Sequence, residues 1–139
     1  NALATAALYH DASEILTGDL PTPIKYHNAE IMSAYHAVED LAVQKLLGML
    51  PPELRETYAD VLAEDKDGDI YPLVKAADKL SAYIKCIEER KAGNNEFLSA
   101  EAQTRAALEA SPLPEVQYFL EHFIPAFERD LDELGAIGQ

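Results

Sequence analysis

Residues that interrupt helices fall at regular places along this chain, and the segments between them show helical spacing of apolar side chains. No stretch alternates apolar and polar residues over the length of a strand. The pattern therefore predicts an all-α fold of about six helices. The interruptions are TGDLPTP at 17–23, the Pro51-Pro52 pair, DKDGD at 65–69, GNN at 93–95 and SPLP at 111–114. The helices expected between them span 2–16, 29–50, 53–64, 71–92, 96–110 and 115–134.

Two of these helices carry specific signals for where they end or bend. Gly93 follows the long helix at 71–92, and glycine is the residue that most easily adopts the left-handed conformation of a C-cap. Pro125 lies inside the last helix, where it has no amide to donate to the carbonyl four residues earlier. We therefore expect the long helix to stop at Gly93 and the last helix to kink near Glu121.

The charge of the chain excludes several classes of partner. Its 139 residues carry 11 Lys and Arg against 25 Asp and Glu, a net charge of −14. General binding to nucleic acid needs clustered cations, and so does binding to an anionic membrane. A small anionic substrate stays possible, because it meets a local field rather than the net charge. Apolar types make up 48% of the residues, enough for one domain spanning 1–139.

The single cysteine, Cys86, allows no intrachain disulfide, which fits a reducing compartment. No apolar run approaches the roughly 20 residues that span a bilayer. We expect no secretory signal, because the sequence shows no basic segment followed by an apolar core at its start. We therefore expect a cytoplasmic location.

The first expected helix is apolar almost all round, which is typical of a buried helix, yet it carries four titratable side chains, Tyr9, His10, Asp11 and Glu14. A buried carboxylate at Asp11 needs a cation, a metal or a water-filled cleft. His10 and Asp11 point about 100° apart on a helix and can lean toward one place beside it. Glu14 follows His10 by one turn, on the same face. The alternative is a satisfied polar network or a wet helix edge.

Asp78 is a second unusual carboxylate, because it borders the apolar stripe of the helix at 71–92. Small neighbours such as Ala77 and Ser81 leave room for a close helix or an ion. The alternative is an ion pair with Lys75 or Lys79 at the helix edge.

Together, His10, Asp11 and Asp78 offer one imidazole and two carboxylates. That donor set suits Mn, Mg, Co or Fe(II) better than structural zinc, which prefers Cys and His. Octahedral coordination needs at least one further ligand besides water.

The other candidate metal sites are weaker. DKDGD does not fit a calcium loop, because Gly68 stands at loop position 4 and Ala76 at position 12, where the EF-hand pattern needs Gly at 6 and Glu at 12. His27, His36 and His122 have no metal-like spacing among themselves, and we expect them at the surface or the edge of the core.

Three segments resemble one family when taken in order: YHDASEILTGDLPTPIKY at 9–26, LVKAADKLSAYIKC at 73–86 and AGNNEF at 92–97. They resemble the HD-domain 5'-deoxynucleotidases, which are small all-α bacterial phosphohydrolases. The HD dipeptide is weak by itself, but the ordered set of motifs is specific. The resemblance covers essentially the whole chain and implies an HD-domain helical bundle.

The family holds one divalent metal, Co, Mn or similar, with a His … His-Asp … Asp pattern. The resemblance assigns His10 and Asp11 to the central pair and Asp78 to the last position. The first His has no match, because only nine residues precede His10. We therefore expect 1–139 to be a single HD-type phosphohydrolase domain that lacks its N-terminal helices. The resemblance also implies a homodimer.

The implied reaction releases the 5'-phosphate from deoxyribonucleoside 5'-monophosphates. Glu14 matches the position of the family's catalytic acid and is the candidate for proton transfer. Asp19 is placed to contact the deoxyribose and disfavour a 2'-hydroxyl, unless its loop is only a rigid double-proline turn. Lys25 and Lys75 are candidates for contacting phosphate on charge alone. The full set of expected substrate contacts is Asp11, Asp19, Leu20, Pro21, Thr22, Asp78, Lys25 and Lys75.

Two other functions stay open at this point. One is another HD phosphohydrolase, acting on cyclic or polyphosphorylated nucleotides; the TGDLPTP loop favours the deoxynucleotidase instead. The other is a non-catalytic helical dimerisation module built on the aromatic last helix, and the carboxylates in the apolar first helix argue against it.

Overall fold

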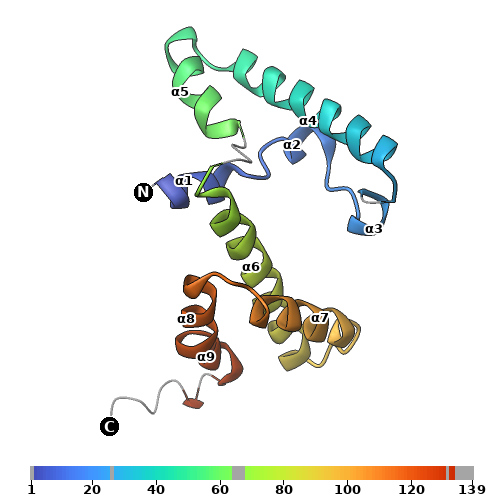
Figure 1. Cartoon of the computed structure of the whole chain (residues 1–139), viewed down its shortest axis with the longest axis vertical. Helices are drawn as coiled ribbons and strands as arrows, with labels where there is room; N and C mark the ends of the chain where they lie inside the picture. Colours follow the sequence, from blue (N-terminus) through green and yellow to red (C-terminus); the bar gives the residue numbers. More distant parts are fainter. Residues whose placement is uncertain (1, 26, 64–67, 131, 134–139) are drawn as a thin grey trace. The chain divides into compact units, whose positions relative to one another are not determined.

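The computed structural model describes residues 2–25, 27–63, 68–130, 132 and 133, and this part of the chain contains helices and no strand (Figure 1). This confirms the expected all-α fold. Within the described residues, no helix combines the length and the apolar content needed to cross a lipid bilayer. The helices are α1 Ala2–Tyr9, α2 Glu14–Thr17, α3 Thr22–Lys25, α4 Ala29–Met49, α5 Pro52–Leu62, α6 Tyr71–Lys91, α7 Leu98–Glu109, α8 Pro114–His122 and α9 Ile124–Glu128.

The chain divides into two compact units, Asn1–Val74 and Lys75–Gln139, with the boundary inside α6. That residues 1–139 form one domain stays a prediction. In the first unit, α2, α3 and α5 all pack against α4, and α1 packs against α5. The rings of Tyr9 and Tyr58 meet edge to face, 5.9 Å between centroids, and so join α1 to α5. The long helix α4 is therefore the element on which the first unit is built.

The helix expected over 2–16 is interrupted, because α1 ends at Tyr9 and residues 10–13 form a turn before α2. The His10 ring donates from Nδ1 to the Ala7 carbonyl over 2.8 Å. In a continuous helix that carbonyl would accept the Asp11 amide. The His10 side chain thus competes with the backbone for the Ala7 carbonyl. The turn continues with bonds between residues three positions apart, such as Glu14 N to Asp11 O over 2.9 Å.

The expectation that the first helix is buried is wrong for α1, which contains no buried residue. Leu8 is 82% exposed, and Ile15 on α2 is 76% exposed. The reason is geometric. Within the first unit α1 packs against α5, and α5 covers one side of α1 and leaves the other side exposed.

The second unit has a compact core in which side chains from four helices meet. Tyr83, Ile87, Leu108 and Val116 are almost completely shielded from solvent. Such burial of apolar area is the main favourable contribution to folding. The whole core cluster consists of Leu80, Tyr83, Ile87, Leu108, Val116 and Ile124.

Both expected helix signals in the second unit are confirmed. Gly93 has φ +86°, and its amide bonds to the Arg90 carbonyl while the Asn94 amide bonds to the Glu89 carbonyl. That pair of bonds is a Schellman motif, which closes α6. The last helix breaks at Phe123 into α8 and α9, two residues before Pro125.

Candidate functional site

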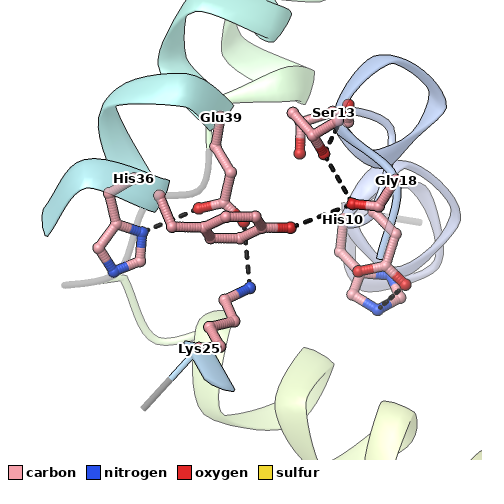
Figure 2. Close-up of polar contacts among 9 residues, drawn as sticks. His10, Ser13, Gly18, Lys25, His36 and Glu39 are labelled. Atoms are coloured by element: carbon pink, nitrogen blue, oxygen red, sulfur yellow. Dashed lines mark hydrogen bonds and ion pairs between the residues drawn. The ribbon is translucent and has the colours of Figure 1, made fainter. Parts of the chain in front are cut away.

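His10, shown in Figure 2, and Asp11 are neighbours in the turn that follows α1. The His10 side chain is 17% exposed and the Asp11 side chain 55% exposed. Nε2 of His10 lies 3.0 Å from Oδ2 of Asp11. The carboxylate therefore faces the ring nitrogen that is turned away from the Ala7 carbonyl.

The donor chemistry of this turn suits a divalent ion. The bond to the Ala7 carbonyl fixes the proton on Nδ1 of neutral His10 and leaves a lone pair on Nε2. A metal-binding histidine commonly uses its other ring nitrogen in this way. Two electron-rich atoms 3.0 Å apart, Nε2 and the Asp11 oxygen, attract a proton or a cation. His10 and Asp11 thus fit two of the three expected ligand positions.

Glu14 begins α2 and is partly buried. Burial raises the pKa of its carboxyl group, and the negative charges of Asp11 and Asp19 raise it further. The positive charge of Lys25 opposes this rise. A carboxylic acid whose pKa is raised holds a proton more readily, which is the property that a general acid needs.

The loop after α2 carries the expected sugar contacts. Gly18 has φ +72° and ψ 161°, a conformation open to glycine, and it turns the chain out of α2. Asp19 and Pro21 are exposed, whereas Leu20 is partly covered. The side chain of Thr22 lies outside the described residues.

Lys25, at the end of α3, is engaged by α4. Its Nζ lies 3.1 Å from Oε1 of Glu39 and 4.4 Å from the centroid of the Tyr35 ring. The ammonium is therefore held by an ion pair and by the face of an aromatic ring. A direct contact between Lys25 and phosphate stays a prediction.

Asp78 and Lys75 are exposed on α6, in the second unit, whereas His10 and Asp11 belong to the first. A metal site shared by His10, Asp11 and Asp78 therefore stays a prediction. Within the described residues, no group of three or more His, Cys, Asp or Glu side chains is arranged to hold a metal ion.

A cavity of about 550 Å³ opens beside His10 in the first unit. Such a volume lies in the range of small-molecule sites. Apolar side chains, among them Val61, Leu62 and Ile70, form much of its wall. Asp60 and Tyr71 add polar groups. The candidate metal ligand His10 therefore borders a space large enough for a small molecule.

The family model for 5'-deoxynucleotidase YfbR-like proteins matches residues 1–127. This chain belongs to that family. Among curated relatives, the 5'-deoxynucleotidase YfbR of Shigella flexneri serotype 5b is 53% identical over 134 residues, which are 96% of this chain and 67% of the relative. The same protein of Escherichia coli K12 (DH10B) is 52% identical over the same shares.

A solved structure agrees with this YfbR-like assignment. It is an HD-domain phosphohydrolase from Listeria innocua, which superposes with a TM-score of 0.73 at 28% identity. The match covers 91% of this chain and 62% of the Listeria chain. The YfbR-like chain thus spans less than two thirds of that structure. HD-domain phosphohydrolases generally depend on a divalent metal.

Sequence reasoning did not single out Tyr35, whose hydroxyl donates to the Gly18 carbonyl, or Glu39, which pairs with Lys25 at the end of α3. Figure 2 shows Glu39 together with Lys25. Tyr35 lies in the helix expected over 29–50 with no motif around it, and His36 is expected at the surface or the edge of the core. Tyr35 and Glu39 lie one helical turn apart, and this spacing by itself is a weak signal. What they contact depends on how α3 returns onto α4, which the sequence does not state.

Proposed function

We propose that this YfbR-like chain carries the metal-dependent hydrolysis of deoxyribonucleoside 5'-monophosphates to deoxyribonucleosides and phosphate. The observation that carries the proposal is the arrangement of His10, Asp11 and Glu14. A fixed imidazole tautomer and a carboxylate face each other, and an acid of raised pKa follows one turn later. Membership in a family of 5'-deoxynucleotidases supports the substrate class.

The residues that would hold the divalent metal, Co, Mn or similar, are His10, Asp11 and Asp78. When bound, such an ion lowers the pKa of a coordinated water and offsets charge on the phosphoryl group. His10 donates from Nδ1 to the Ala7 carbonyl, which places the lone pair of the neutral ring on Nε2, the nitrogen that faces Asp11.

Glu14 would hold or deliver the proton that the departing 5'-oxygen needs, because its raised pKa favours the protonated form. Asp19 would contact the sugar, with Leu20, Pro21 and Thr22 shaping the same side of the site. Asp11 and Asp78 would take part in substrate binding as well as in holding the metal, and Lys75 would supply a cation near the phosphate. The homodimer stays a prediction from the family, and the cytoplasmic location stays a prediction from the sequence.

The test uses the full-length protein that contains this chain. Phosphate release is measured from deoxyribonucleoside and ribonucleoside 5'-monophosphates, and from cyclic and polyphosphorylated nucleotides, with Mn or Co and with a chelator. We expect release from the deoxy monophosphates only with metal. Preference for cyclic or polyphosphorylated nucleotides would favour another HD phosphohydrolase, and no release from any nucleotide would favour a non-catalytic module.

Two substitutions with a matched control complete the test. Asp78→Asn should remove both the activity and the rise in melting temperature that metal binding gives. Glu14→Gln should lower kcat by about 10²–10⁴ while the metal still raises the melting temperature. Asp40→Asn, an exposed change on α4, is the control and should alter neither readout. Full activity of Asp78→Asn in chelator would contradict the metal mechanism.

A further inference from the structure

The segment Gly18–Lys25 contains the expected sugar contact, Asp19, and both of its ends are bonded to α4 (Figure 2). At the first end, the Tyr35 hydroxyl donates to the Gly18 carbonyl over 3.3 Å. At the other end, Nζ of Lys25 donates to Oε1 of Glu39 over 3.1 Å. Asp19 itself is exposed, so its side chain can reach a ligand while the backbone beside it is held.

The two contacts reinforce each other. Nζ of Lys25 lies 4.4 Å from the centroid of the Tyr35 ring, so the same ammonium meets both residues of α4. Nδ1 of His36 lies 2.8 Å from the second carboxylate oxygen of Glu39, Oε2. Glu39 thus has a partner on each oxygen, and this limits the rotation of its side chain.

The ion pair between Lys25 and Glu39 is partly buried, so it holds the two side chains together more strongly than an ion pair at the surface would. The side chains of Lys25 and Glu39 are each 21% exposed. Although burial acts to raise the pKa of Glu39, the hydrogen bonds from His36 and Lys25 outweigh it and the pKa is lowered. The carboxylate is therefore charged at neutral pH and available to hold Lys25.

Tyr35 and Glu39 lie one turn apart on α4 and face the same side. The helix keeps the two attachment points at a fixed separation of about 6 Å along its axis. A short segment fixed at both ends on a rigid helix has fewer conformations than a free loop. The position of Asp19 is thus defined before a substrate binds.

We propose that Tyr35 and Glu39 are positioning residues that hold the Gly18–Lys25 segment in place and thereby set the preference for a deoxyribose over a ribose. This rests on the proposed function. Lys25 acts in it as the anchor of the segment. Discrimination against one hydroxyl depends on a contact placed to within a fraction of an ångström, so the preference is the property most sensitive to a loosened segment.

The test compares Tyr35→Phe and Glu39→Gln in the full-length protein. We expect each to lower the ratio of kcat/KM for deoxy over ribo monophosphates by about three- to tenfold, since Tyr35→Phe removes a hydrogen bond to the segment and Glu39→Gln removes the charge that pairs with Lys25. The change should appear mainly in KM, with kcat for the deoxy substrate nearly kept. Hydrogen exchange of backbone amides at 18–25 should become faster without substrate, whereas exchange in α7 should stay unchanged.

Matched controls separate the contacts from the substitutions. Tyr118→Phe removes a hydroxyl from an exposed ring on α8, and Asp40→Asn removes a charge beside Glu39 on the exposed side of α4. Neither should alter the ratio or the exchange at 18–25. Lys25→Met should match Glu39→Gln, and the double variant should be no worse than either, because both remove the same ion pair.

Three results would overturn the proposal. One is unchanged exchange at 18–25 in both variants. Another is an unchanged substrate ratio despite faster exchange. A third is a Lys25→Met variant that raises KM equally for both sugars while Glu39→Gln has no effect, which would assign Lys25 to the phosphate. If the wild-type protein releases phosphate from no nucleotide, the proposed function and the selectivity role both fail, and exchange alone then decides whether the segment is held by α4.

Discussion

Nε of Arg90 donates to both carboxylate oxygens of Glu101, over 3.1 and 3.0 Å. The same guanidinium donates from Nη2 to Glu128 over 2.7 Å. One side chain at the end of α6 therefore joins α7 and α9 within the second unit. These two acidic partners raise the pKa of Arg90 above its usual value.

Arg90→Lys should lower the stability of the protein, because an ammonium cannot reproduce the planar fork that meets two carboxylates at once. The matched control is Arg105→Lys. Arg105 pairs with Glu109, one helical turn further along α7, and these two side chains are more exposed. In urea unfolding followed by circular dichroism, the midpoint should fall by roughly twice as much for Arg90→Lys as for Arg105→Lys. Equal midpoints for the two variants would show that the contacts of Arg90 with α7 and α9 add no stability.

The core of the second unit can be tested with two leucines of α7. Leu108 is 1% exposed, whereas Leu98 is 46% exposed. Leu108→Ala should lower the free energy of unfolding by about 2–5 kcal/mol, because it removes buried methyl groups and leaves a cavity. Leu98→Ala should cost less than about 1 kcal/mol. Similar losses in denaturant unfolding would mean that Leu108 is not in a tightly packed core.

Two glycines give a test of opposite sign. Gly93→Ala places a side chain at φ +86° and should destabilise the protein by about 1 kcal/mol, although the added methyl group meets no atom within 4 Å. Gly48 lies inside α4 and also has open space around it. Gly48→Ala should therefore stabilise the protein by about 0.4–1 kcal/mol. Two changes of the same sign in unfolding free energy would rule out the left-handed cap.

At neutral pH the charged side chain of Glu14 should make the metal-free protein less stable than a neutral side chain at this position would. The pKa of its carboxyl group is raised in the folded state above the ordinary value of 4.5, mainly by burial, so the folded protein binds the proton more tightly than the unfolded chain. The contribution of Glu14 to stability is thus fully present below pH 4.5 and is lost as the pH rises through the folded-state pKa. Glu14→Gln should therefore gain stability relative to the wild type as the pH rises from 4 to 7.

The measurement is thermal unfolding in chelator across that pH range, with Glu56→Gln, an exposed change on α5, as the control. The control should show no such trend. A difference between Glu14→Gln and the wild type that does not change with pH would contradict a raised pKa.

Much of the fold follows from local signals in the sequence. Pro51-Pro52, the glycine at 93 and Pro125 act through backbone chemistry that is nearly independent of the rest of the chain. Helix ends at these places were therefore predictable. The break after Tyr9 was not, because it depends on one imidazole taking a backbone acceptor in a segment without glycine or proline.

The candidate site divides in a similar way. His10, Asp11 and Glu14 are close in sequence, so their proximity follows from the chain itself. The contacts of Tyr35 and Glu39 with the Gly18–Lys25 segment join residues 14 and 17 positions apart and depend on tertiary packing. Asp78 belongs to the second unit, and its relation to His10 stays a prediction from the family pattern.

The placement of the tyrosines has a practical consequence for spectroscopy. The chain has no tryptophan, so its ultraviolet emission comes from tyrosine. Tyr83 is 1% exposed within the core of the second unit, whereas the rings of Tyr9 and Tyr58 contact each other in the first. Tyr83 and Tyr118 are the tyrosines of the sequence after residue 74, so replacing both by phenylalanine leaves tyrosine emission from the first unit alone, and the melting of that unit can be followed without an added label.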